Sequence, residues 1–175
     1  MLRRLRTDQR GVAAVEFALL APVMILLYCG LAELTMAMMA ERRASHAASV
    51  VADLVSQSNQ MNATQMTDVF RVADAIMQPF PADGMDMRVT SVKADANAVP
   101  KVVWSRGDGL TALTATTTAT AVPAGLLVAG DSIVMAEVTY AYESPLHYVI
   151  PDGMTFKQTF FLKPRKSPEV VWTAG

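Results

Sequence analysis

The chain has 175 residues, of which 52% are hydrophobic and 18% charged, and its formal net charge at pH 7 is −1. This length accommodates one modest globular domain plus a segment that dwells in lipid, and it excludes two large domains. The small net charge excludes the basic surface that nucleic-acid binding requires, and the single cysteine, Cys29, excludes an intrachain disulfide and a cysteine-based zinc site.

A basic N-terminal segment precedes a long apolar run. The basic residues are Arg3, Arg4, Arg6 and Arg10. From Val12 to Ala32 there are 21 residues in which Glu16 is the only charge. At a rise of about 1.5 Å per residue, a helix of this length crosses a hydrocarbon core of about 30 Å. By the positive-inside rule, we expect a cytoplasmic N-terminus, a single membrane span and export of everything after residue 40.

A cleaved signal peptide is the main alternative for this segment, because it also has a basic start and an apolar centre. Its cleavage site would follow the apolar run. The best match there, Ser45-His46-Ala47, is weak.

The helix is expected to continue beyond the membrane to about residue 58. Small and apolar residues follow one helical stripe there: Ala44, Ala47, Ala48, Val51, Leu54, Val55 and Ser58. The polar cluster QSNQMN then ends the helix. We therefore expect a helix over 12–58, transmembrane over about 12–40, whose second half lies on an exported head of residues 59–175.

The head is expected to contain one more helix and a small antiparallel sheet. The second helix, at about 64–78, is amphipathic, and one face collects Met66, Val69, Phe70, Ala73, Ile76 and Met77. A half-buried strand is predicted in SIVMAEVTYAYES, paired antiparallel with a strand in MTFKQTFFLK. Weaker strands are predicted at 86–94 and 100–105, and TALTATTTATA at 111–121 is either an edge strand or a mobile loop.

The sequence contains no recognisable catalytic constellation. Neither His46 nor His147 stands beside a nucleophile pattern, and there is no glycine-rich phosphate loop or metal-ligand spacing. We therefore expect no enzyme, no metal and no cofactor.

Glu16 is the unusual residue, because a carboxylate in a spanning helix costs about 2.5–3.5 kcal/mol on insertion scales and by default indicates a function or a partner. The simpler interpretation is that Glu16 lies near the cytoplasmic interface and reaches water or Arg10. For Glu33, the outer end of the run and the nearby water give a sufficient explanation.

The opening RGVAAVEF resembles the processing site of type IV pilins and pseudopilins, which a prepilin peptidase cuts after the glycine. The longer stretch RGVAAVEFALLAPVMILLYCGLAEL resembles the start of the TadE-like pseudopilins of the tight-adherence (Flp, type IVc) pilus system. VMAEVTYAYESPL and FFLKPRK are similar to the head region of TadE/TadG-type chains. More than a hundred residues beyond the span indicate a minor or assembly-type pseudopilin instead of the main filament subunit.

The resemblance implies a cut between Gly11 and Val12, which removes the basic leader 1–11 and makes Glu16 the fifth mature residue. The new amine of Val12 would then pair with Glu16, in one chain or between neighbours, and set the register of subunits. The pairing lowers the cost of both charges in lipid. Further residues are expected in the processing motif and in helix packing: Phe17, Ala13, Ala14, Ala18, Ala21 and Pro22.

The sequence thus predicts a pilin-like α+β protein of the bacterial inner membrane, with a periplasmic or extracellular head and incorporation into a pilus. Its expected partners are the prepilin peptidase, other pilins and pseudopilins, the pilus assembly platform and the lipid bilayer, without nucleic acid. An alternative is an uncleaved, membrane-anchored periplasmic binding or sensor domain. That alternative predicts a monomer in detergent, a ligand pocket in the head and indifference to Gly11→Ala.

Overall fold

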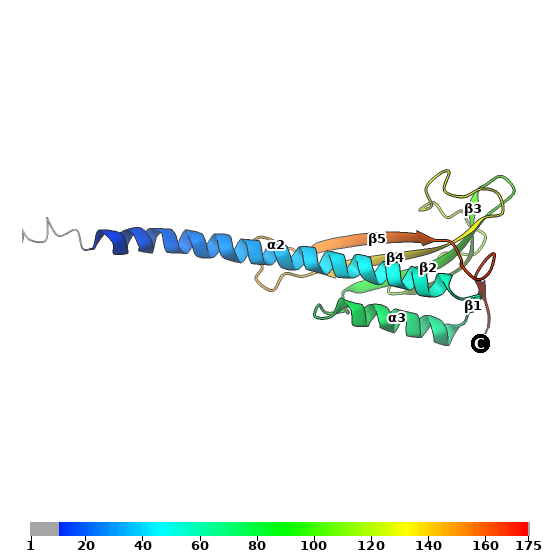
Figure 1. Ribbon diagram of the computed structural model, residues 1–175, viewed down its shortest axis with the longest axis horizontal. Coiled ribbons are helices and arrows are strands. Elements are labelled where there is room, and N and C mark those ends of the chain that lie inside the picture. Colours follow the sequence, from blue (N-terminus) through cyan, green and yellow to red (C-terminus); the bar gives the residue numbers. More distant parts are fainter. Residues whose placement is uncertain (1–10, 175) are drawn as a thin grey trace, which may run out of the picture.

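The computed structural model describes residues 11–174, so the predictions for Arg3, Arg4, Arg6 and Arg10 lie outside the described residues. One helix extends far beyond a compact head at its C-terminal end (Figure 1). The elements in chain order are α2 (Val12–Ser56), β1 (Gln60–Met61), α3 (Ala63–Met77), β2 (Met85–Ala94), β3 (Pro100–Asp108), β4 (Ser132–Tyr142), β5 (Met154–Leu162) and β6 (Val171–Trp172).

Helix α2 is continuous over 45 residues, with Pro22 inside it. It ends at Ser56 with Gln57 as its C-cap, at the start of the polar cluster that predicts the break. Helix α3 follows after a short turn. Its N-cap is Asn62, whose side chain accepts the backbone N–H of Gln65, while the Gln65 side chain accepts the Asn62 N–H. This capping box satisfies two of the N–H groups that a helix start leaves unpaired.

The four long strands form an antiparallel sheet in the order β3-β2-β4-β5. The predicted antiparallel pairing of β4 with β5 is confirmed, with Tyr140 opposite Phe156 and Val134 opposite Leu162. Beside this sheet, the dipeptides β1 and β6 pair in parallel and bring the C-terminal segment to the end of α2. The α+β class is confirmed: a long apolar helix, a second helix and a small antiparallel sheet in a pilin-like layout.

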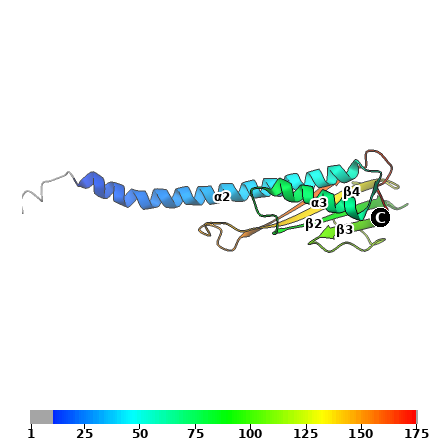
Figure 2. The same ribbon diagram turned by 90° about the horizontal axis from the view of Figure 1, so that it is seen from below.

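The main core lies where the C-terminal half of α2, together with α3, packs on one face of the sheet (Figures 1 and 2). Alanine dominates the buried side of α2 and lets the helix approach the strands closely. The buried alanines are Ala37, Ala40, Ala44, Ala47, Ala48 and Ala52. The predicted face of α3 is buried as well, except that Ile76 is only partly covered.

The prediction that β4 is half-buried is wrong for its first half. Ile133 and Met135, on the face opposite α2, are 2% and 0% exposed. They belong to a second cluster with Val102 and Leu127, because the segment between β3 and β4 folds over that face. The threonine-rich part of this segment is not a strand, and it follows the outer edge of β3 through the backbone bonds Val102 N–H to Thr117 O and Thr116 N–H to Val102 O.

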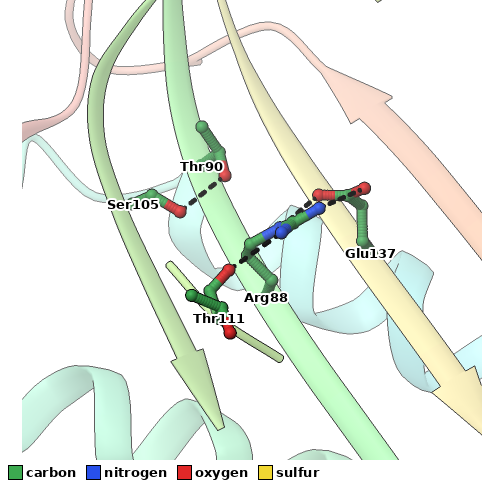
Figure 3. A network of polar contacts seen from close by, with 5 residues as sticks. All are labelled: Arg88, Thr90, Ser105, Thr111 and Glu137. Atoms are coloured by element: carbon green, nitrogen blue, oxygen red, sulfur yellow. Dashed lines mark hydrogen bonds and ion pairs between the residues drawn. The ribbon is translucent and has the colours of Figure 1, made fainter. Parts of the chain in front are cut away.

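A polar network fixes this covering segment to the sheet (Figure 3). Arg88 on β2 donates to both carboxylate oxygens of Glu137 on β4, at 2.7 and 2.9 Å, and to the carbonyl of Thr111 at 2.8 Å. The hydroxyls of Thr90 and Ser105 are 2.9 Å apart beside it. The ion pair between Arg88 and Glu137 is bidentate and mostly covered, so it also restricts the register of β2 against β4.

Candidate functional site

Helix α2 divides into two halves with different surroundings. Between Val12 and Leu31 only Ala21, Cys29 and Gly30 are even partly covered, whereas a buried stripe begins at Glu33 and continues to Ser56. The first half is long and apolar enough to cross a membrane, and the described chain covers none of its most apolar 18-residue window. An N-terminal apolar helix of this kind indicates a single-pass membrane anchor. The residues that the sequence predicts for processing, subunit register and helix packing lie at or just after the start of this half.

Gly11 is the N-cap of α2, with φ of −92°, a backbone conformation open to any residue. A Cβ built at Gly11 would have no heavy atom within 4 Å. The fold of the described chain therefore gives no reason for a glycine at this position. Any requirement for Gly11 must come from a molecule that binds it.

Glu16 and Phe17 lie one turn into the helix with exposed side chains, and Phe17 is 73% exposed. Ala13 lies three residues before Glu16 and four before Phe17, so these three share one side of the helix. Ala14, Ala18 and Ala21 follow the neighbouring stripe at spacings of four and three. A surface that combines small residues with one carboxylate lets another helix approach closely and pair with the charge.

Pro22 lies inside α2 and cannot donate the backbone hydrogen bond that would otherwise reach the carbonyl of Ala18. The helix remains continuous there, and α2 is gently curved in Figure 2. Lipid-buried helices accommodate proline because neighbouring groups can satisfy the carbonyl that loses this donor.

The interpretation of Glu33 as a carboxylate beside water is wrong. Its side chain is 0% exposed, and its two oxygens accept the backbone N–H groups of Tyr148 at 3.2 Å, Val149 at 2.6 Å and Ile150 at 3.4 Å. These amides belong to the connector between β4 and β5. Glu33 therefore connects this end of the head to the helix. The three backbone N–H groups take the place of the water molecules that would surround an exposed carboxylate.

The histidines and the acidic side chains are the other described residues that could carry chemistry. No group of three or more histidine, cysteine, aspartate or glutamate side chains among residues 11–174 is arranged to hold a metal ion. His46 lies on the exposed side of α2 and His147 on the connector after β4. The first half of α2 is an exposed apolar helix with one carboxylate near its start, and its second half is packed in the core of the head.

Neither the curated proteins nor the solved structures contain a match to this chain. The family described as TadE-like protein matches residues 11–53, which begin at Gly11 and continue through the exposed half of α2 into its buried half. The match ends before α3 and the sheet, so it concerns the helix alone. Over these residues the predicted resemblance is confirmed: the helix of this chain is similar to that of TadE-like proteins.

Proposed function

We propose that the protein is a minor pilin or pseudopilin that takes part in the assembly or initiation of a Tad/Flp-type pilus, after a prepilin peptidase cuts behind Gly11. The family match suggests involvement in the Tad pilus system. The observation that best supports the specific role is the bare N-terminal half of α2, whose apolar side chains no other described part of the chain covers. Such a surface is stable only in lipid or against other helices.

The proposed cut would change the charges at the start of α2. It would free an amine on Val12, four residues before Glu16 and therefore about one helical turn away. In a membrane or a bundle of helices, an unpaired amine and an unpaired carboxylate are both costly, and pairing reduces both costs. Pairing between chains would fix the axial position of one subunit relative to the next.

The head would then be a rigid attachment to this helix. The buried stripe of α2 packs with the sheet and α3 in one core, and α2 is continuous from Val12 to Ser56. The proposed orientation places residues 1–11 in the cytoplasm and the head in the periplasm or outside the cell.

Mass spectrometry of the protein from cells with and without the peptidase tests the cut. We expect the chain to begin at Val12 only where the peptidase is present, and Gly11→Ala to remain uncut. Because a Cβ at Gly11 meets nothing, this variant keeps its fold and reports recognition alone. An intact leader in wild-type cells that contain the peptidase would contradict the proposal.

The role of Glu16 needs a separate measurement. Glu16→Gln keeps the shape of the side chain and removes its charge, so we expect normal cleavage and membrane insertion but a loss of incorporation into pili. Glu41→Gln is the matched control on the exposed side of the same helix. Normal incorporation of Glu16→Gln would exclude the register role.

The second candidate function is a membrane-anchored binding domain that is never cut. A hollow of about 630 Å³ favours it, lined by Met36 on α2 and by Phe80, Tyr140 and Tyr142 of the head. This candidate predicts that Gly11→Ala and Glu16→Gln do not change the function of the protein. It also predicts that a ligand bound in the hollow raises the free energy of unfolding of the head.

A further inference from the structure

The connector between β4 and β5 wraps against α2 at the end of the head nearest the bare half of the helix (Figure 1). We call residues 144–150 the collar. Three of its apolar side chains face outward, with Leu146 48%, Tyr148 53% and Val149 53% exposed. Its first and last residues, Ser144 and Ile150, are buried and hold it to the head.

The height of the collar along α2 is fixed by two contacts. A Cβ built at Gly30 would lie 3.1 Å from Cγ2 of Val149, and Glu33 accepts the three collar N–H groups. The collar therefore lies level with residues 30–33, where the apolar run that starts at Val12 ends. That run is about 31 Å long as a helix, which matches the thickness of the hydrocarbon core.

The chemistry of the collar suits the boundary between acyl chains and headgroups. Glu33 binds the N–H groups of residues 148–150, so these backbone groups do not need water. Tyrosine is enriched at this depth, because its ring is apolar and its hydroxyl reaches the polar layer. The exposed charged or ionisable side chains of the same connector, Glu143, His147 and Asp152, flank the apolar ones and fit the hydrated headgroup layer.

We propose that the collar is a second membrane contact, in which Leu146, Tyr148 and Val149 enter the interface of the outer phospholipid leaflet beside the spanning helix. The inference rests on the proposed anchoring of α2 in the membrane. A single helix leaves the tilt and rotation of the head free, and a second contact on one side of it restricts both. The head is then held at a defined height before any transfer into a pilus.

The test uses the full chain with Cys29→Ser, reconstituted alone in phosphatidylcholine vesicles at a high lipid ratio. Single cysteines are introduced as Val149→Cys, Val128→Cys and Leu20→Cys and labelled with a nitroxide. Val128 is the matched control, because it is a valine, 66% exposed, on the covering segment of the sheet and outside the collar. Accessibility to oxygen, which partitions into lipid, is compared with accessibility to a water-soluble nickel complex.

We expect the oxygen-to-nickel ratio at position 149 to be several-fold higher than at 128 and lower than at 20. A ratio at 149 equal to that at 128, with position 20 in lipid, overturns the collar contact and leaves the anchor intact. A water-like ratio at position 20 overturns the anchoring itself, and with it the collar contact. Shielding of position 149 from both reagents means that another copy of the chain covers the collar, which also overturns the lipid contact.

Discussion

The two halves of α2 have similar alanine contents and opposite surroundings. Both are rich in alanine, yet Ala13, Ala14 and Ala18 are exposed, whereas each alanine from Ala37 to Ala52 that faces the sheet is at most 2% exposed. In the second half, small side chains allow the helix to lie close to strands of its own chain. We infer that the same property in the first half serves helices or lipid outside the chain, so one helix contains an internal and an external interface.

The largest expected difference between the two regions concerns phenylalanine. Phe70 on α3 is 7% exposed and packs in the core with α2, and its truncation to alanine should cost about 3–5 kcal/mol of the free energy of unfolding. Phe17→Ala should change it by less than about 0.5 kcal/mol, because Phe17 is outside the core. Urea unfolding in detergent, followed by near-ultraviolet circular dichroism, measures both. A similar loss in the two variants would mean that the bare half of α2 also packs on the head.

Enlarging an alanine gives the next largest difference. Ala48→Leu places three further carbons into a fully buried site and should lower the free energy of unfolding by about 1–3 kcal/mol, since the neighbouring side chains cannot move away freely. Ala18→Leu should leave this free energy unchanged and, on the proposed function, reduce incorporation into pili. The comparison fails if Ala18→Leu destabilises the head or if both variants assemble normally.

Glu33 marks the boundary between the halves, and its substitution should loosen the collar without unfolding the head. Glu33→Gln keeps the size of the side chain but removes the charge that strengthens the hydrogen bonds from residues 148–150. We expect hydrogen exchange at these three amides to become faster by about tenfold, with exchange in β2 and β4 unchanged. Glu41→Gln is the control on the exposed side of α2. Unchanged exchange at the collar would contradict the anchoring role of Glu33.

The parts of the fold that sequence predicts are those with a clear period. The stripe of α2 from Ala44 to Val55 and the buried face of α3 follow the helical repeat, and β4 and β5 alternate strongly enough to predict their pairing. The burial of Met135 is not predictable in this way, because it depends on an irregular segment folding over the second face of the sheet. An alternating pattern says which residues share a face, and it does not say whether that face is covered.

The candidate site is likewise predictable from the sequence only in part. Gly11, Glu16 and Phe17 are found from their spacing and from the resemblance, and the processing and register roles stay predictions. The role of Glu33 is not predictable from the sequence, because its partners are backbone N–H groups, the first of which is 115 residues away. Every residue except proline has such a group, so no residue type in the connector indicates that a carboxylate will bind there.

The smallest expected effect is a pH dependence of the free energy of unfolding, and it arises from a carboxylate in the head. The side chain of Lys163, which donates to Asp131 at 2.9 Å, and the backbone N–H of Val128 lower the pKa of Asp131 below its ordinary 3.8. A carboxylate with a lowered pKa stabilises the fold fully above its ordinary pKa, and the contribution is lost as the pH falls through the lowered value. The free energy of unfolding should therefore decrease below about pH 4 by an amount typical of an exposed ion pair. Asp131→Asn should reduce this decrease, and Asp152→Asn, on the connector after β4, should not. If Asp131→Asn leaves the acid dependence unchanged, the ion pair with Lys163 does not stabilise the head, and the covering segment must be held by its apolar contacts and by Arg88.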